Sequence, residues 1–97
     1  MLTAIKIEII VSKAQSNKII DLLEKSGIYE YTILDIYKGR GNKDGVVSHS
    51  VNSATENVYM FSVVKQELKQ KAIELIYPYF KTSGGLFVIS DVTVIDP

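Results

Sequence analysis

The sequence predicts an α+β fold of four strands and two helices in the order strand, helix, strand, strand, helix, strand. Three observations lead to it: an opening run with period-two apolar residues, two segments with an apolar stripe at helical spacing, and further runs rich in β-branched and aromatic residues. This order, at these lengths, most often gives a ferredoxin-like antiparallel sheet with two helices on one face. We therefore expect a single domain of that kind over residues 1–97.

The first strand and the first helix have clear local signals. Isoleucine and valine alternate with other residues through 2–11, which is typical of a strand with one buried face. Ser12 and Gln15 are predicted to form a capping box, the hydroxyl and the amide serving the free N–H groups at the start of a helix. That helix should run from about 13 to 26, with Gly27 ending it and an apolar stripe made of Ile19, Leu22 and Leu23.

The rest of the chain predicts the remaining elements. Residues 29–37 and 58–64 are rich in β-branched and aromatic side chains and are predicted to be strands. The second helix follows, with an apolar stripe made of Leu68, Ala72, Leu75 and Ile76. Pro78 should end this helix at the preceding residue or bend its last turn, because proline lacks a backbone N–H. A turn over 81–85 and a final strand over 86–95 complete the chain.

Both faces of the last two predicted strands are apolar. Strands 58–64 and 86–95 carry apolar residues at odd and even positions alike, so both of their faces should be buried. Two helices can cover only one face of the sheet. A chain this small also buries a modest share of its surface alone, so subunit association would help its stability. We therefore predict an oligomer in which the sheets of neighbouring subunits cover the second face.

Composition excludes several classes of function. The chain carries 11 Lys plus Arg and 11 Asp plus Glu, a formal net charge of zero, which argues against a general electrostatic contact with nucleic acid. The absence of cysteine excludes disulfides, thiolate chemistry and Cys-based metal sites. No apolar run reaches membrane-spanning length, and the N-terminus lacks the features of a secretory signal, so we expect a soluble, cytoplasmic protein.

The long segment 38–56 is the first candidate binding site. It is polar, rich in Gly, Asn and Ser, and expected to be flexible; structureless loops longer than roughly 12–15 residues in a compact domain are usually functional or disordered. Glycines let backbone N–H groups approach an anion, and Lys and Arg supply charge-assisted bonds to phosphate. The alternative is a solvated hairpin loop with ordinary turn residues. The candidate anion-binding residues are Lys38, Gly39, Arg40, Gly41 and Lys43.

Gly84 and Gly85 are the second candidate, because a tight turn before a strand offers backbone amides to a ligand. The geometry of joining a helix to a strand explains the same glycines at least as well. His49 is the single histidine and lies between two serines in a polar segment, where solvation is the simpler explanation. The sequence offers no metal-ligand cluster and no nucleophile paired with a base. Neither a metal site nor enzymatic activity is expected.

Three short motifs together resemble the PII signalling superfamily. They are G-I-x-x-x-T at 27–32, K-G-x-G at 38–41 and G-G-L-F-V-I at 84–89, and the element order and length agree over nearly the whole chain. The resemblance implies a homotrimer of ferredoxin-like subunits that binds adenine nucleotides between subunits and contacts partner proteins through the long loop, called the T-loop. The likeness is closer to the PII-like branch that includes bicarbonate-transporter regulators and carboxysome-associated proteins.

The resemblance also implies roles for individual residues. Thr32 matches the threonine that faces the nucleotide, and Gly84 and Gly85 match the B-loop glycines beside the phosphates. The start of the T-loop is matched by Lys38, Gly39 and Gly41. Within this loop Arg40 or Lys43 would neutralise phosphate.

The effector and the partner are less closely defined. The family's lysine before the third strand and its arginines after the last strand have no counterpart at 55–57 or at 96–97. Fewer phosphate contacts favour AMP or cyclic AMP, or no nucleotide at all, over ADP or ATP. The expected function is regulation of a target protein, for which a membrane transporter is one candidate, through the loop 38–56. The alternative is a trimer resembling the divalent-cation tolerance proteins, with a metal-related or purely structural role and no nucleotide.

Overall fold

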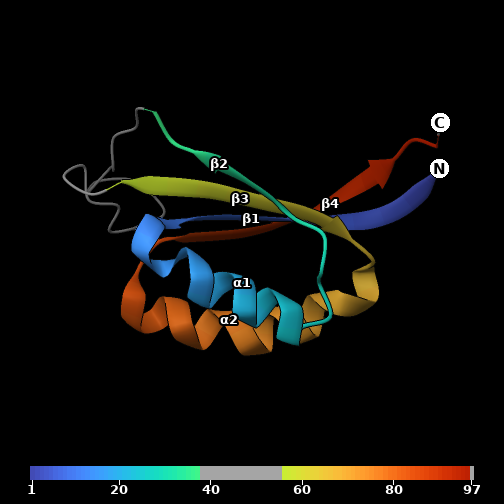
Figure 1. The fold of residues 1–97 in the computed structure, drawn as a ribbon. Helices are drawn as coiled ribbons and strands as arrows, with labels where there is room; N and C mark the ends of the chain where they lie inside the picture. The colour runs from blue at the N-terminus through green and yellow to red at the C-terminus, as the bar shows by residue number, and fades with distance from the viewer. Residues whose placement is uncertain (38–55, 97) are drawn as a thin grey trace, which may run out of the picture.

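The computed structural model describes residues 1–37 and 56–96, which form one layer of sheet and one layer of helices (Figure 1). In chain order the elements are β1 (Leu2–Ser12), the 3-10 turn η1 (Lys13–Gln15), α1 (Ser16–Lys25), β2 (Thr32–Asp35), β3 (Asn57–Val64), the 3-10 turn η2 (Gln66–Leu68), α2 (Lys69–Ser83) and β4 (Leu86–Val94). The predicted ferredoxin-like order of strands and helices is confirmed.

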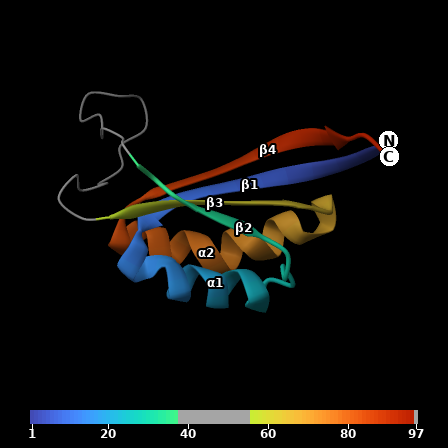
Figure 2. The ribbon, with the colours of Figure 1, turned by 45° about the horizontal axis from the view of Figure 1, so that its top comes forward.

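The sheet has the strand order β2-β3-β1-β4, and every neighbouring pair is antiparallel. β1 and β3 are therefore central, while β2 and β4 are the two edges. Both helices lie against the same face of the sheet, as the two ribbon views show (Figures 1 and 2). The opposite face, which we call the open face, is covered by no helix of the described chain.

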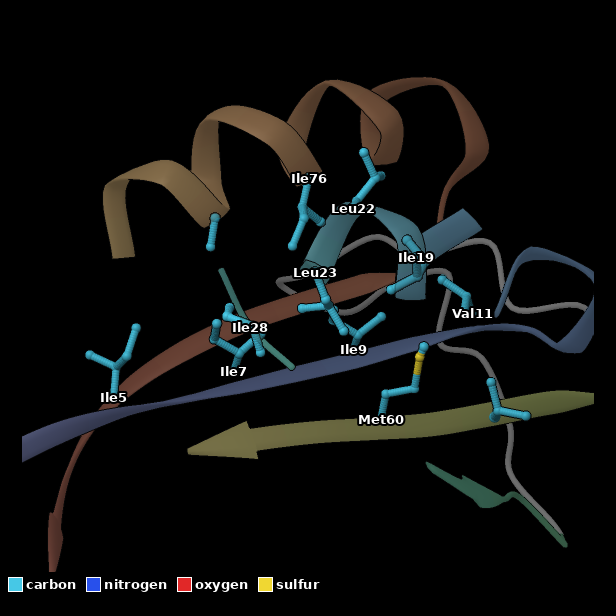
Figure 3. Close-up of a cluster of buried hydrophobic side chains, with 12 residues drawn as sticks. Ile5, Ile7, Ile9, Val11, Ile19, Leu22, Leu23, Ile28, Met60 and Ile76 are labelled. Carbon is cyan, nitrogen blue, oxygen red and sulfur yellow. The ribbon is translucent and has the colours of Figure 1, made fainter. Parts of the chain in front are cut away.

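The core lies between β1 and the two helices (Figure 3). Alternate residues of β1 from Ile5 to Val11 point into it and are at most 2% exposed, as the period-two pattern predicts. Burying one such side chain contributes roughly 1.5–3 kcal/mol. The other members of the core cluster are Ile19, Leu22, Leu23, Ile28, Val58, Met60, Ala72 and Ile76.

The start of α1 differs from the prediction, and its end agrees with it. Neither Ser12 nor Gln15 makes a side-chain capping hydrogen bond, so the predicted capping box is wrong; the chain enters α1 through η1 instead. At the other end Gly27, with φ +89°, donates its N–H to Glu24 O at 3.0 Å. Ile28 donates to Leu23 O at 2.9 Å, which completes a Schellman motif with its apolar contact.

The helix α2 continues through Pro78 to Ser83, so the first of the two predicted effects of Pro78, an end of the helix, is wrong, and a bend of the last turn stays a prediction. Most of the predicted turn over 81–85 is also wrong, because residues 81–83 are helical. Proline removes one N–H donor, but tertiary packing compensates for that loss. Beyond the proline, the rings of Phe80 and Phe87 stack with centroids 5.5 Å apart, and both pack against the core. The last turn of α2 is therefore fixed to β4.

The strand β2 is shorter than the predicted 29–37 and covers Thr32–Asp35, with all four residues exposed. β2 pairs with β3. The segment before β2 contacts β3 through a side chain instead of through strand pairing, because the Ser62 hydroxyl donates to Glu30 O. The predicted burial of both faces of the last two strands does not occur within one chain. β3 buries Val58, Met60 and Ser62 toward the helices, and β4 has no fully buried residue.

Candidate functional site

The structure describes three of the eight predicted site residues: Thr32, Gly84 and Gly85. The other five lie outside the described residues, and so does His49; the five are Lys38, Gly39, Arg40, Gly41 and Lys43. The flanks of the segment 38–55 are described, at the ends of β2 and β3. The geometry around these flanks and around the glycine turn defines the candidate site.

Lys13 lies at the base of the segment 38–55 and contacts both of its flanks. Its Nζ lies 3.8 Å from an oxygen of Asp35, the last residue of β2, and 3.5 Å from an oxygen of Glu56, the residue before β3. Its backbone N–H also donates to Glu56 O at 2.8 Å. Ile36 N–H donates to Asn57 O at 3.0 Å, which closes the two flanks on each other.

Sequence reasoning did not find Lys13. No local motif marks it, because its two carboxylate partners come from distant parts of the chain and meet it only through the pairing of β1, β3 and β2. All three side chains are more than half exposed, so these ion pairs contribute little stability and are screened by salt. They bring one cation and two anions to the base of the predicted binding loop.

The two glycines after α2 have separate structural roles. Gly84 has φ +77° and donates its N–H to Phe80 O at 3.1 Å, so this amide already caps the helix. Gly85 has φ +111°, and a Cβ there would lie 2.7 Å from Ile10 O and 2.8 Å from Phe80 Cε1. A side chain at Gly85 is therefore excluded by backbone as well as by φ. The amide of Gly84 is therefore the less available of the two for a ligand.

Thr32 does not meet the glycine turn within one chain. It lies on β2 opposite Phe61, with its side chain on the open face, whereas the turn leads into β4. These strands form opposite edges of the sheet and are separated by three interstrand spacings, roughly 14 Å. Thr32 and the glycine turn therefore do not converge within one chain.

The glycine turn and the flanks of the segment 38–55 do share one support. A Cβ on Gly85 would touch Ile10 and Val11, and Lys13 contacts Asp35 and Glu56. Both features therefore rest on the last residues of β1 and on the residue that follows it. They lie at the same end of the molecule, where α1 begins and α2 ends (Figure 1).

Neither a metal-binding cluster nor a membrane-spanning helix is found in the part of the chain that the structure describes. Residues 1–37 and 56–96 contain no group of three or more His, Cys, Asp or Glu residues placed to hold a metal ion. None of the described helices is long and apolar enough to cross a membrane.

Comparison with known proteins shows which family this chain matches. The family described as nitrogen regulatory protein P-II matches residues 4–97. A search of the curated proteins finds no match.

Solved structures match over nearly the full length. The CPII protein of Thiomonas intermedia K12, bound to ADP, AMP and acetate, is 26% identical, with 98% of this chain and 91% of that chain covered and a TM-score of 0.80. The same protein bound to ADP and bicarbonate gives 26% identity, 96% and 89% coverage and a TM-score of 0.76. The GlnK–ATP complex of B. subtilis, 17% identical with 93% and 82% coverage and a TM-score of 0.64, shares the fold.

Proposed function

We propose, because this chain belongs to the nitrogen regulatory protein P-II family, that it is a PII-like regulator whose effector is an adenine nucleotide bound between subunits. Members of this family are signalling regulators. The bound effector would set the state of the segment 38–56, and this segment would contact a target protein. Binding that orders such a segment is a known form of molecular switch.

The observation that carries the proposal is the position of Thr32 and the glycine turn on opposite edges of one sheet. Head-to-tail contacts between copies bring opposite edges together, and they close into a ring when the rotation is right. A cyclic trimer, which the family resemblance implies, would create equivalent sites of this kind. CPII of Thiomonas intermedia K12, 26% identical, is bound to ADP and AMP, which supports an adenine nucleotide as the ligand class.

Each predicted residue has a role in this proposal. Thr32 of one subunit binds a polar edge of the nucleotide, and the amide of Gly85 in the next subunit faces the phosphate. Lys38, Gly39 and Gly41 form the start of the loop, and Arg40 or Lys43 neutralises the charge of the phosphate. Because Gly84 already donates to Phe80 O, its role is to shape the turn rather than to donate to the ligand.

AMP or cyclic AMP is the proposed effector, ahead of ADP and ATP. The position before β3 carries Glu56, whose carboxylate lies 3.5 Å from Lys13 Nζ, and Asp35 adds a second carboxylate beside the same cation. Among the described residues these contacts leave one net negative charge beside the loop, which disfavours a ligand with several phosphate charges. The target protein is proposed to be one that reads the state of the loop, and a membrane transporter is one candidate.

The test is a thermal-shift and calorimetric comparison of AMP, cyclic AMP, ADP and ATP on protein whose mass in solution has been measured. A ligand that binds only the folded state stabilises it by about 2.7 kcal/mol at a hundred times its dissociation constant. We expect a clear shift with AMP or cyclic AMP and weaker heats with ATP. The reverse order would contradict the effector ranking, and no shift with any nucleotide would contradict the proposed function.

Arg40→Ala combined with Lys43→Ala tests the phosphate role. This double variant should weaken nucleotide binding and leave the oligomer folded. The matched control is Lys18→Ala combined with Lys71→Ala, which removes the same charge from exposed positions on α1 and α2. Equal affinities in the two double variants would remove the phosphate role of the loop cations.

A further inference from the structure

The peptide unit between Gly84 and Gly85 is held at each of its two residues. The Ser83 hydroxyl donates to Gly84 O at 3.1 Å, in a half-buried position. A Cβ on Gly85 would lie 2.8 Å from Phe80 Cε1 and 2.7 Å from Ile10 O, so the Gly85 backbone already lies against the Phe80 ring and the end of β1. Together these contacts leave the peptide unit little freedom to rotate.

Holding the Gly84 oxygen also fixes the direction of the Gly85 amide. The peptide unit is planar and trans, so its C=O and its N–H point in opposite directions. A hydroxyl that fixes the oxygen therefore fixes the N–H as well. The Gly85 N–H points away from the Gly84 oxygen that Ser83 holds.

The direction of this amide matters because the turn follows the C-terminal end of α2. The helix macrodipole places partial negative charge at that end and opposes an anion there. The N–H of Gly84 donates to Phe80 O and so is turned toward the helix. An anion at this turn therefore depends on a donor that stays aimed at it, since a hydrogen bond weakens steeply below an N–H···O angle of about 120°.

The ring of Phe80 is itself fixed by its neighbours. It stacks on Phe87 of β4, with centroids 5.5 Å apart, and meets the Tyr79 ring edge-on at 6.4 Å. All three rings pack against the core. The Phe80 ring is thus a firm support for the Gly85 backbone, tied to the core and not to a surface side chain.

We propose that Ser83 and Phe80 are positioning residues for the phosphate of the nucleotide: they hold the peptide unit between Gly84 and Gly85 in one orientation, so that the Gly85 N–H is presented to the anion in a fixed direction. A group held in its binding orientation avoids the cost of being ordered by the ligand. The inference rests on the proposed function, because it takes the nucleotide as the ligand. It deepens that function by assigning part of the phosphate affinity to two side chains that act through the backbone.

Calorimetry with AMP and with adenosine, which lacks the phosphate, tests the role of Ser83. Ser83→Ala frees the Gly84 oxygen, so it should weaken the binding of AMP by roughly tenfold and leave the affinity for adenosine unchanged. Ser83→Thr keeps a hydroxyl and should retain the affinity for AMP. The matched control is Thr82→Ala, which removes the neighbouring hydroxyl, whose hydrogen bond goes to Tyr79 O at 3.0 Å.

Phe80→Leu tests the ring in the same way. It removes the support beside Gly85 and should lower the affinity for AMP more than the affinity for adenosine. Its control is Tyr79→Leu, which removes a ring that packs against the core from the same helix and is not among the atoms nearest to a Cβ on Gly85. A ring that stacked directly on the adenine base would lower both affinities equally when removed, and that result would overturn the positioning role of Phe80.

NMR relaxation of the Gly85 amide gives a readout that needs no ligand. The order parameter should be close to the value of about 0.85 for rigid backbone in the unchanged protein and in Thr82→Ala. In Ser83→Ala it should fall toward the value of about 0.6 that marks flexible backbone. The amide of Gly27, in the turn after α1, serves as the internal reference and should keep its value in every variant.

The two readouts separate this inference from the proposed function. An unchanged order parameter of Gly85 in Ser83→Ala, or equal losses of affinity for AMP and adenosine, would overturn the positioning role of Ser83 and leave nucleotide binding standing. A Gly85 amide that loosens in Ser83→Ala, in a protein that binds no nucleotide, would contradict the proposed function alone, because the orientation of the peptide unit by Ser83 would stand.

Discussion

At Gly85 the backbone leaves no room for a side chain. A Cβ would lie 2.7 Å from Ile10 O, at a φ of +111° that side chains rarely adopt. We expect Gly85→Ala to lower the free energy of unfolding by about 2–4 kcal/mol. Gly27→Ala is the control, because its φ is +89° but the nearest atom to its Cβ would be at an ordinary 3.5 Å, so it should lose about 1–2 kcal/mol. Urea unfolding at one protein concentration measures both, and equal losses would show that strain in φ alone explains them.

Tyr59 is the residue whose ionisation links the open face to stability. Burial, followed by the hydrogen bond to Glu8 and the Glu8 charge, raises the pKa of Tyr59 from 10.0 to about 12. An acid with a raised pKa in the folded state adds stability that is fully present below pH 10.0 and is lost as the pH rises from 10.0 to about 12. Titration of tyrosinate absorbance should lose its highest transition in Tyr59→Phe and keep it in Tyr37→Phe, whose ring is 99% exposed.

Glu8→Gln should shift that same transition to lower pH, because it removes the carboxylate that opposes formation of tyrosinate. The prediction concerns the folded protein, so the titration needs a folding control at each pH. A transition that stays at the same pH in Glu8→Gln would assign the whole shift to burial. In that case the hydrogen bond would be structural only.

Among the elements, α2 is the one that carries an unfavourable residue in its interior. Pro78 lies inside Lys69–Ser83 and cannot donate to the carbonyl one turn earlier. Pro78→Ala restores that donor at an exposed position and should raise the free energy of unfolding by roughly 1–3 kcal/mol, reduced by the greater freedom of the unfolded chain. Thermal unfolding of Pro78→Ala, compared with that of Tyr77→Ala as a control, would measure this gain in stability. A lower stability in Pro78→Ala would mean that the proline shapes the last turn against β4.

The elements that the sequence predicts well are those specified locally. The alternation in β1 and the glycine that ends α1 are read directly from neighbouring residues. The failures have non-local causes: α2 passes Pro78 because Phe80 packs on Phe87, and β2 extends only as far as its pairing with β3, over Thr32–Asp35. Ser12 is of a residue type typical of helix N-caps, yet its side chain makes no capping hydrogen bond and the chain enters α1 through η1. In each case packing between distant residues overrode a local signal.

At the scale of the whole molecule, the candidate site is the part that sequence reasoning describes least. The motifs identified Thr32 and the glycine turn as candidate residues. They did not indicate that the sheet places the two on opposite edges. No local motif marks Lys13, because it meets Asp35 and Glu56 only after the strands have paired. The placement of these residues in space is what turns separate motifs into the proposal of a site between copies.

Such a site makes nucleotide binding and assembly depend on each other. If Thr32 and Gly85 contact one nucleotide from two copies, a saturating ligand stabilises the oligomer by about 2.7 kcal/mol per site at a hundred times its dissociation constant. That corresponds to roughly a hundredfold tighter association for each site, and linkage requires the affinity for nucleotide to fall when the protein is diluted below its assembly range. Sedimentation equilibrium with and without AMP, and binding measured over a dilution series, would test both effects. The same affinity in dilute monomer and in oligomer would place the whole site within one chain, where the sheet keeps Thr32 and Gly85 apart, and would require another set of ligand contacts.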